Sequence, residues 1–459
     1  MKDEFDNLMM DYYELTMGQV YFNEGKQDEI AYFDLYFRKA PDGSGFAIAN
    51  GIDKCIRYLK QFCFKKRQID YLRSLKCFTE DYLRYLRRLK FTGDVWAVQD
   101  GTVVIPNEPI LTIKAPIIQA QLIETALLTI INRSSLITTK ASRIVRSAQG
   151  RAIMEFGSRR AHGQESAIEG AKDAYIAGAI GTACVASGQR YNIPVLGTMA
   201  HSFVQSFDSE YKAFEAYARA YSDNCILLID TYDTLNSGII NAVNVYKNVL
   251  KPMGKQLKGV RIDSGDLLSL SKKVRSILDE NGLSHTAITV SSSLDEYKIK
   301  TLLDNDAPID NFGVGENLIT AKSQPVFGGV YKLVALEKDG KILPKIKLSE
   351  DVVKTINPHF KTVYRFYDEK GKIAKDYLCV FDEKASVEDR NILCLYNKVL
   401  DKGKVVCPFK SAVDKRLYLQ EQINTLTENQ LKLIGADTIK LELSEKLQHI
   451  KNTLINQVT

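Results

Sequence analysis

Polar side chains that could bind a ligand or do chemistry follow short apolar runs at several points in this sequence. The run 193–196 is followed by Gly197, Thr198 and His201, and other runs end in the same way. Because the carboxyl ends of parallel strands lie on one face of a sheet, we expect the groups that follow them to converge. The segments that follow the runs are 155–163, 197–201, 230–234, 261–266, 291–293 and 313–315.

Two adjacent arginines, Arg159 and Arg160, follow the first of these runs. A guanidinium holds a carboxylate or a phosphate with two parallel hydrogen bonds, so the pair favours recognition of an anion. The alternative is that the two side chains point in opposite directions and that one of them forms a surface ion pair. Arg261 would bring a further guanidinium to the same face.

Two carboxylates flank Ser264 and Gly265 directly before a predicted helix. Asp263 and Asp266 in this arrangement suit the hydroxyl groups of a ribose or a hydrated Mg²⁺ ion. The alternative for Asp266 is that it only caps the helix that follows. Asp230, which ends a neighbouring run, would add another carboxylate.

Glycines and aromatic residues complete the predicted site. Gly313 and Gly315 would let the backbone approach a phosphate, although a tight turn is the alternative for such a pair. Phe156 and Tyr13 could stack on a flat aromatic ligand, and packing in the core is their alternative. The sequence has no G-x-x-x-x-G-K-[ST] motif, so any bound ATP would not be held by a P-loop. Together these groups predict a site for an anionic aromatic acid and a phosphorylated sugar, with Mg²⁺.

The elements that position these groups alternate between predicted strands and helices. There are about seven such strands, and most of them are apolar on both faces, which is typical of a parallel sheet covered by helices. We therefore predict an α/β fold with an irregular (β/α) barrel, and a doubly wound open sheet is the alternative. The predicted strands are 151–156, 194–196, 225–230, 258–263, 286–291, 311–314 and 329–335.

Changes in this pattern along the chain predict three regions. Residues 1–116 read as an N-terminal α+β domain, and residues 117–340 as the α/β barrel. Residues 341–459 read as a smaller C-terminal region of short strands that packs on the N-terminal domain. Long helices are expected at 117–149, 166–189 and 421–455.

Composition and charge narrow the class of protein. The net charge of +6 over 459 residues is mild, and a small anionic substrate explains it as well as nucleic acid does, so we expect no nucleic-acid partner. No apolar run approaches the length that spans a bilayer, and the acidic residues 1–6 do not resemble a signal peptide. The 8 cysteines form no C-x-x-C pair, so we expect reduced thiols in a cytoplasmic protein.

The motifs as a set resemble those of the nicotinate phosphoribosyltransferase family. They occur in the family's order between residue 13 and about residue 335, and the runs Val-Arg-Ile-Asp-Ser-Gly-Asp and Glu-Phe-Gly-x-Arg-Arg are the specific ones. The matching segments are 13–17, 155–161, 197–203, 230–232, 259–266 and 313–315.

The resemblance implies a reaction and an assembly. Nicotinate and 5-phosphoribosyl 1-pyrophosphate would give nicotinate mononucleotide and pyrophosphate, coupled to ATP hydrolysis, as the first step of NAD salvage from nicotinate. It also implies an N-terminal α+β domain, an irregular barrel and a homodimer with shared sites.

The resemblance also assigns roles by position. Tyr13 and Phe156 would enclose the pyridine ring, and His201 would be phosphorylated by ATP. Mg²⁺ would arrive with the sugar pyrophosphate near Asp263, without a fixed metal site in the protein. Asp263 and Asp266 would be catalytic together with His201. The remaining contacts are nicotinate at Arg159, Thr198 and Arg261, the ribose and its metal at Asp263, Ser264 and Asp266, the 5′-phosphate at Gly313 and Gly315, and the substrates in general at Arg160, Asp230 and Gly265.

One position departs from the pattern. Where some relatives carry Thr after the Gly-Val-Gly segment, this chain has Glu316 followed by Asn317. A carboxylate close to a phosphate is unfavourable, so we expect Glu316 to point away from the site.

The chemistry of the implied reaction assigns His201 a role other than general base. The attacking pyridine nitrogen already has a free lone pair, so the transfer step has no proton to remove. Catalysis then depends on positioning and on neutralising the departing pyrophosphate. A neutral imidazole can accept a phosphoryl group, and we expect phosphohistidine formation at His201 to tighten the site for the sugar pyrophosphate.

Alternative functions use the same residues differently. A nicotinamide phosphoribosyltransferase would have to recognise a neutral amide, for which the arginine pair is less useful. A quinolinate enzyme would bind two carboxylates and lacks this long C-terminal region. A metal-dependent barrel hydrolase could use His162, His201, Asp230 and Asp263, but the sequence has no His-x-His at a strand end. A protein that only binds a partner fits the polar strand ends poorly.

Overall fold

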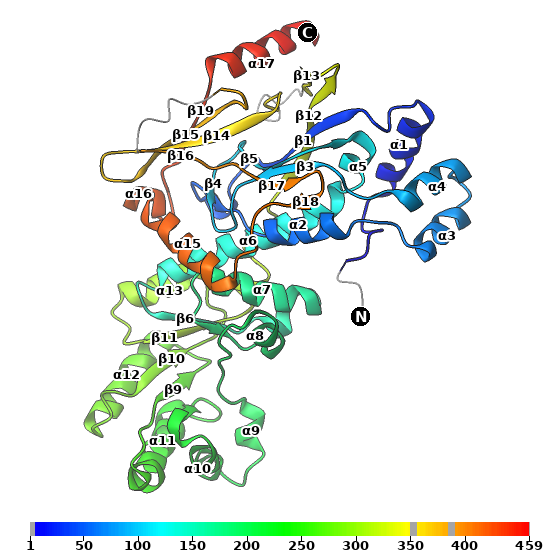
Figure 1. Cartoon of the computed structure of the whole chain (residues 1–459). Helices are drawn as coiled ribbons and strands as arrows, with labels where there is room; N and C mark the ends of the chain where they lie inside the picture. The colour runs from blue at the N-terminus through cyan, green and yellow to red at the C-terminus, as the bar shows by residue number, and fades with distance from the viewer. Residues whose placement is uncertain (1–4, 349–355, 384–390, 459) are drawn as a thin grey trace. The chain divides into compact units, whose positions relative to one another are not determined.

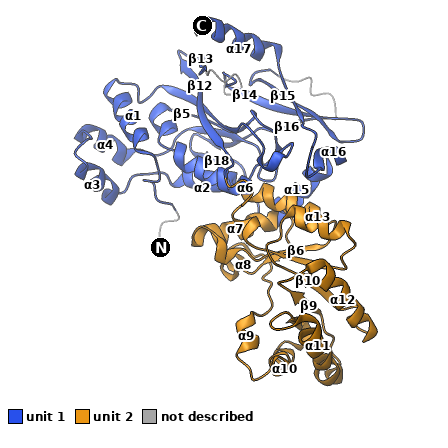
Figure 2. Ribbon diagram, turned by 180° about the vertical axis from the view of Figure 1, so that it is seen from behind, with its two compact units in different colours: residues 1–136, 326–459 blue, residues 137–325 orange. Residues whose placement is uncertain are grey.

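The computed structural model describes residues 5–348, 356–383 and 391–458. Residues 1–4, part of the segment for which we expect no signal peptide, lie outside this range. The chain forms two compact units, which Figure 2 colours separately. Unit 1 comprises residues 1–136 and 326–459, and unit 2 comprises residues 137–325. The domain boundaries predicted after residues 116 and 340 stay predictions.

Unit 2 is built on a parallel sheet (Figure 1). The strands have almost no exposed residues, as expected for strands that helices cover on both faces. The predicted α/β class with an irregular barrel is confirmed in the form of a parallel half-barrel, whose strand order begins at β7 and ends at β8. The order is β7 (Gly181–Thr182), β6 (Ala152–Glu155), β11 (Asn311–Val314), β10 (Ala287–Val290), β9 (Gly259–Ile262) and β8 (Ile226–Leu228).

The helices of unit 2 follow the strands, with two differences from the prediction. The helix expected over 166–189 is wrong, because α7 ends at Ile176 and Gly178 then adopts φ +117°, which turns the chain into β7. The strand expected at 194–196 is reduced to a single parallel bridge between Val195 and Thr182. The helices are α7 (Gln164–Ile176), α8 (Val185–Tyr191), α9 (His201–Gln205), α10 (Glu210–Ala220), α11 (Ile239–Val245), α12 (Leu267–Glu280), α13 (Glu296–Asp304) and α14 (Glu316–Ile319).

Unit 1 contains an antiparallel sheet, and this sheet corrects one barrel strand. Residues 329–335 were predicted as the last strand of the barrel, but they belong to β12, which pairs antiparallel with β1. The apolar run was recognised correctly, but its partner lies about 300 residues away and its pairing cannot be read from local periodicity. The order is β13 (Lys341–Pro344), β12 (Gly329–Lys338), β1 (Ile30–Phe37), β5 (Pro109–Pro116), β3 (Asp94–Ala97), β17 (Asn397–Asp401) and β18 (Lys404–Val405).

Two smaller sheets complete the strands of unit 1. One pairs β2 (Ala47–Ile48) with β4 (Val103–Val104), and the other has the order β16 (Ile392–Cys394), β14 (Lys361–Tyr367), β15 (Ile373–Val380) and β19 (Lys440–Leu443). The continuous helix predicted over 421–455 is wrong, because β19 interrupts it and pairs parallel with β15.

The helices of unit 1 lie mainly near its two ends in sequence. Among the helices that the structure describes, none combines the length and the apolar character that crossing a bilayer requires. α6 (Glu124–Ser147) begins in unit 1 and ends in unit 2. The others are α1 (Tyr12–Asn23), α2 (Ile52–Gln61), α3 (Lys66–Ser74), α4 (Glu80–Arg88), α5 (Ile117–Gln121), α15 (Ala412–Asn424), α16 (Glu428–Leu431) and α17 (Glu445–Val458).

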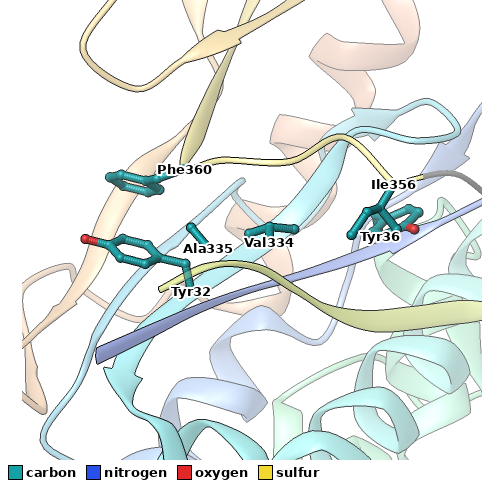
Figure 3. Packing of buried hydrophobic residues seen from close by; sticks show 6 residues of the cluster. All are labelled: Tyr32, Tyr36, Val334, Ala335, Ile356 and Phe360. Atoms are coloured by element: carbon teal, nitrogen blue, oxygen red, sulfur yellow. The ribbon is translucent and has the colours of Figure 1, made fainter. Parts of the chain in front are cut away.

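A cluster of buried residues packs the segment 356–360 against β1 and β12 (Figure 3). The ring centroids of Tyr32 and Phe360 lie 5.1 Å apart, and the centroids of Trp96 and Phe360 lie 4.8 Å apart. Aromatic pairs at such distances add to the free energy gained from burying their area. The cluster therefore fixes the C-terminal part of unit 1 to its main sheet. Its buried members are Tyr32, Tyr36, Val334, Ala335, Ile356 and Phe360.

The carboxyl group of Glu14, in the first turn of α1, is fully buried within unit 1. Its Oε1 atom accepts hydrogen bonds from the Thr125 hydroxyl, from the Thr125 amide at 3.2 Å and from the Asp11 amide at 3.3 Å. Its Oε2 atom has no hydrogen-bond partner among the described residues. Burial raises the pKa of Glu14 to about 7, although the hydrogen bonds from Thr125 and Asp11 oppose this rise.

We predict that Glu14→Gln is more favourable for stability at pH 8 than at pH 5, when the unfolding free energy of the variant is compared with that of the wild type at each pH. The pKa of Glu14 is higher in the folded protein than its ordinary value of 4.5, so the folded state holds this proton more tightly. The stability that the proton contributes is present at low pH and is lost as the pH rises through about 7. The gain of the variant over the wild type should grow by about 1–2 kcal/mol between pH 5 and pH 8.

Thermal unfolding at both pH values measures this difference. Glu24→Gln is the matched control, because Glu24 follows the same helix but is exposed to solvent. A stability gain of Glu14→Gln that is the same at pH 5 and pH 8 would contradict the prediction.

Candidate active site

A cavity of about 610 Å³ lies in unit 2 at the carboxyl ends of β6, β9, β10 and β11. The predicted convergence of strand-end groups is therefore observed for most of the segments. The cavity is lined by Phe156, Ser158, Arg159, Arg160, Ala183, Gly197, Thr198, Met199, Ala200, Arg261, Asp263, Ser291, Ser292, Ser293, Gly313, Gly315 and Glu316.

The guanidinium of Arg261 is the best-anchored cation in the cavity lining. Its Nη2 atom lies 3.2 Å from Asp263 Oδ2, and its Nε atom donates to the Ser291 hydroxyl at 3.0 Å. Its Nη1 atom donates to the Thr198 hydroxyl at 3.2 Å, and its central carbon lies 5.5 Å from the centre of the Phe156 ring. The side chain is only 11% exposed, so these contacts fix its orientation.

Gly313 is required by the packing of Phe156. A Cβ atom on Gly313 would lie 2.6 Å from two carbons of the Phe156 ring, and one on Gly315 would lie 3.1 Å from the Phe156 carbonyl oxygen. The close approach of an aromatic ring and its backbone thus accounts for both glycines. A contact of this segment with a 5′-phosphate stays a prediction.

Asp230 organises the loop that follows β9. Its Oδ2 atom accepts hydrogen bonds from the Asp263 amide at 2.8 Å and from the Ser264 hydroxyl at 2.6 Å. Its Oδ1 atom is buried without a hydrogen-bond partner among the described residues. The Asp263 carboxylate in turn accepts a hydrogen bond from Ser291. Asp230 therefore acts on Asp263 from the neighbouring strand, and whether it also contacts a substrate stays a prediction.

Asp266 caps helix α12. Its carboxylate accepts hydrogen bonds from the amides of Leu268 at 3.1 Å and Ser269 at 3.3 Å. Asp266, Ser264 and Gly265 are exposed, and among the described residues only Asp263 of this loop lines the cavity with Arg261. The helix-cap interpretation of Asp266 accounts for what is observed, and its proposed ribose contact stays a prediction.

His201 begins helix α9 at the edge of the cavity lining. Its Nδ1 atom lies 3.1 Å from the Thr231 hydroxyl, and its Nε2 atom lies 3.9 Å from Asp263 Oδ2. The side chain is 40% exposed to solvent. Thr231 was not assigned a role from the sequence, although it directly follows Asp230 in a recognised motif.

The exposed arginines meet an acidic residue at the cavity. Arg159 and Arg160 both line the cavity, and the Arg160 Nε atom lies 3.9 Å from Glu316 Oε2. Glu316 also lines the cavity, and whether its carboxylate points away from a bound phosphate stays a prediction. Its Oε1 atom lies 2.6 Å from the Lys322 ammonium, and this hydrogen bond lowers the pKa of Glu316. Lys322 and Arg160 thus compensate the negative charge of Glu316, which would otherwise repel an anionic ligand.

Tyr13 lies on α1 of unit 1 and is 43% exposed. Burial of the hydroxyl and the nearby Glu124 carboxylate raise its pKa, so the phenol is neutral. Because Tyr13 belongs to unit 1 and Phe156 to unit 2, their predicted sandwich around a pyridine ring stays a prediction.

The carboxylates of the site are already paired within the protein, and the Mg²⁺ ion expected to arrive with a substrate stays a prediction. Asp263 already contacts Arg261 and Ser291, and Glu316 contacts Lys322, so neither is free to build an all-protein cage. Mg²⁺ commonly binds through one carboxylate together with substrate phosphates and water. Within the described residues, no group of three or more His, Cys, Asp and Glu side chains is arranged to hold a metal ion.

The serine run after β10 contributes more than the sequence indicated. Ser291 contacts both Arg261 and Asp263, yet it was noted only as part of a strand end. Ser292 and Ser293 adopt φ angles of +113° and +48°, which are uncommon for residues other than glycine. Three serines at the end of an apolar strand indicate that polar groups lie there, but the sequence does not show which residues they contact.

Comparisons with known proteins agree with the geometry. The family model of the nicotinate phosphoribosyltransferase N-terminal domain matches residues 8–132, the model of the nicotinate phosphoribosyltransferase family matches residues 151–385, and the model of the C-terminal domain matches residues 383–451. These matches cover each of the motifs on which the resemblance was based.

Individual relatives match most or all of the chain. The chain is 38% identical over 478 aligned residues to the nicotinate phosphoribosyltransferase of Bacillus subtilis, covering 100% of this chain and 96% of that one. It is 44% identical over 358 residues to a nicotinate phosphoribosyltransferase of Mycobacterium tuberculosis, covering 78% and 75%. The crystal structure of human nicotinic acid phosphoribosyltransferase matches with a TM-score of 0.85 and 26% identity, covering 98% and 100%. The chain therefore belongs to the nicotinate phosphoribosyltransferase family.

Proposed function

We propose that this chain converts nicotinate and 5-phosphoribosyl 1-pyrophosphate to nicotinate mononucleotide and pyrophosphate, with hydrolysis of ATP to ADP and phosphate. This reaction would be the first step of NAD salvage from nicotinate. The observation that carries the proposal is the anchored guanidinium of Arg261 beside the Phe156 ring, in a cavity at the ends of parallel strands. Membership of the family supports the same reaction.

Recognition of the acid rests on the cations of the cavity. Arg159 and Arg160 line it with their side chains exposed, and Arg261 lies deeper beside Phe156. A guanidinium pairs with a carboxylate more strongly than with a neutral amide, because both partners are charged. The arrangement therefore favours nicotinate over nicotinamide.

The transfer step requires positioning more than proton transfer. The lone pair of the pyridine nitrogen attacks the anomeric carbon, and the bond from that carbon to the pyrophosphate oxygen breaks. Holding the ring against Phe156 would bring the nitrogen to this carbon. Mg²⁺ bound with the sugar pyrophosphate would supply positive charge that neutralises the leaving group. Asp263 is the carboxylate that would lie near this ion. The cavity arginines add to that neutralisation.

His201 is proposed to accept the terminal phosphoryl group of ATP. If the Nδ1–H group donates to Thr231, the lone pair of the imidazole is on Nε2, which can attack the terminal phosphorus as ADP departs. Hydrolysis of the phosphohistidine would return the free imidazole and release phosphate. A cycle of this kind can alternate the site between a state that binds the sugar pyrophosphate tightly and one that binds it loosely.

We also propose a homodimer in the cytoplasm. Met9, Tyr12 and Tyr13 are 50%, 55% and 43% exposed at the start of α1, an apolar surface that supports contact with a second copy. All 8 cysteines have free thiols, in keeping with a reducing compartment.

The purified protein should form nicotinate mononucleotide from nicotinate and 5-phosphoribosyl 1-pyrophosphate, and ATP should increase the yield. Chromatographic detection of the nucleotide, with and without ATP, measures this. Nicotinamide at the same concentration should give little product, because it lacks the carboxylate. Equal or greater use of nicotinamide would overturn the proposed substrate.

Arg159→Ala should raise the KM for nicotinate by about tenfold or more, since a charge-assisted hydrogen bond to the substrate is lost. The ATPase activity without nicotinate should change far less. Steady-state kinetics of both reactions measure the split. Arg219→Ala is the matched control, because Arg219 is 60% exposed and pairs with Glu215 on α10. Equal losses in both activities of Arg159→Ala would contradict a role in binding the carboxylate.

His201→Asn should abolish labelling of the protein by ATP that carries a labelled terminal phosphate. In the wild type the label should be stable in alkali and labile in acid, as expected of a phosphohistidine. His162→Asn is the control, because His162 is also an exposed histidine of unit 2 and should leave the label unchanged. A label that persists in His201→Asn would show that another residue accepts the phosphoryl group.

A further inference from the structure

We propose that Ser291 is a positioning residue that keeps the Arg261 guanidinium available to the carboxylate of the substrate. Its hydroxyl separates Arg261 from full pairing with Asp263. This inference rests on the proposed function, because it assigns Arg261 to recognition of the acid.

The backbone places Ser291 beside both partners. It directly follows β10, and its amide donates to the carbonyl of Ile262 at 2.9 Å, on the strand that carries Arg261 and leads to Asp263. The residue is only 4% exposed. The positive φ angles of Ser292 and Ser293 turn the chain directly after it, so Ser291 is the last residue held against β9. Its side chain therefore has a defined position between the two charged groups.

A hydroxyl is suited to this position because it can both accept and donate. The Arg261 Nε–H group can only donate, and it donates to Ser291 Oγ at 3.0 Å. The ionised Asp263 carboxylate can only accept, and its Oδ1 atom accepts the hydrogen bond from Ser291. One side chain thereby satisfies the donor of one ion and the acceptor of the other.

Loss of the hydroxyl would leave Arg261 and Asp263 free to pair with each other more completely. At present the ion pair between them has its closest approach at 3.2 Å, between Nη2 and Oδ2, while Nε and Oδ1 are both hydrogen-bonded to Ser291. An arginine and a carboxylate prefer two parallel hydrogen bonds, here Nε to Oδ1 and Nη2 to Oδ2. Rotation into that pair would draw the guanidinium away from Thr198 and reduce its attraction for a substrate carboxylate. Ser291 occupies both of the atoms that the second hydrogen bond would need.

The matched substitutions are Ser291→Thr, which keeps the hydroxyl, and Ser291→Val, which has nearly the same shape as threonine without it. For Ser291→Val we expect the KM for nicotinate to rise about tenfold, while kcat and the KM for 5-phosphoribosyl 1-pyrophosphate change by less than about threefold. Ser291→Thr should stay within about threefold of the wild type in all three constants. If Ser291 had only a structural role, the two substitutions would impair the enzyme's kinetic constants to a similar extent, because both add a methyl group.

Crystal structures of the two variants test the geometry without reference to activity. In Ser291→Val the Arg261 and Asp263 side chains should form two parallel hydrogen bonds, and in Ser291→Thr the present contacts should remain. Ser291→Ala serves the same purpose if the larger side chains prevent folding. Arg261 that still contacts Thr198 in the variants without a hydroxyl, or equal KM values for Ser291→Thr and Ser291→Val, would overturn the proposal. A wild type that forms no nicotinate mononucleotide would overturn the proposed function instead, and the crystal structures would still decide the role of Ser291.

Discussion

The site depends on holding one guanidinium in a nearly buried position without cancelling its charge. Arg261 is 11% exposed, and burying an unpaired cation is costly unless its donors find acceptors. The acceptors Asp263 and Ser291 follow the neighbouring strands β9 and β10, and Thr198 follows the segment that forms a parallel bridge to β7. Only a parallel arrangement brings the carboxyl ends of these strands together, so the half-barrel and the anchored cation require each other.

The surrounding charges are arranged so that the cavity still attracts an anion. Asp263 Oδ2 lies 3.2 Å from Arg261, while its other oxygen accepts a hydrogen bond from Ser291 and its amide donates to Asp230. Glu316 brings a second carboxylate to the lining, but Lys322 pairs with it at 2.6 Å. Each carboxylate is thus paired with a protein group, and Arg159 adds an exposed cation to the lining that can attract an acidic substrate.

The sequence was sufficient to predict the features that depend on local pattern. Apolar runs followed by polar groups located β6, β9, β10 and β11 and the residues at their ends, because buried parallel strands have this character. Features that depend on distant partners were missed or misassigned. β12 was placed in the barrel because its apolar run looks like a barrel strand, whereas its pairing with β1 depends on residues far away in sequence. The pairing of Glu316 with Lys322 was missed because a side-chain contact across a turn leaves no pattern in the sequence. Asp266 shows the opposite case, since a local rule for helix caps was enough to describe it.

Asp263 connects the two kinds of chemistry proposed for the site. One of its carboxylate oxygens lies 3.2 Å from Arg261 and 3.9 Å from the Nε2 atom of His201. A phosphoryl group on Nε2 would place about two negative charges beside this carboxylate, and the repulsion at such a distance is large in a partly buried site. The carboxylate could relieve that repulsion only by shifting toward its cationic or hydroxyl partners. The phosphorylation state of His201 and the orientation of Arg261 would then be linked through one side chain, without a longer relay through the fold.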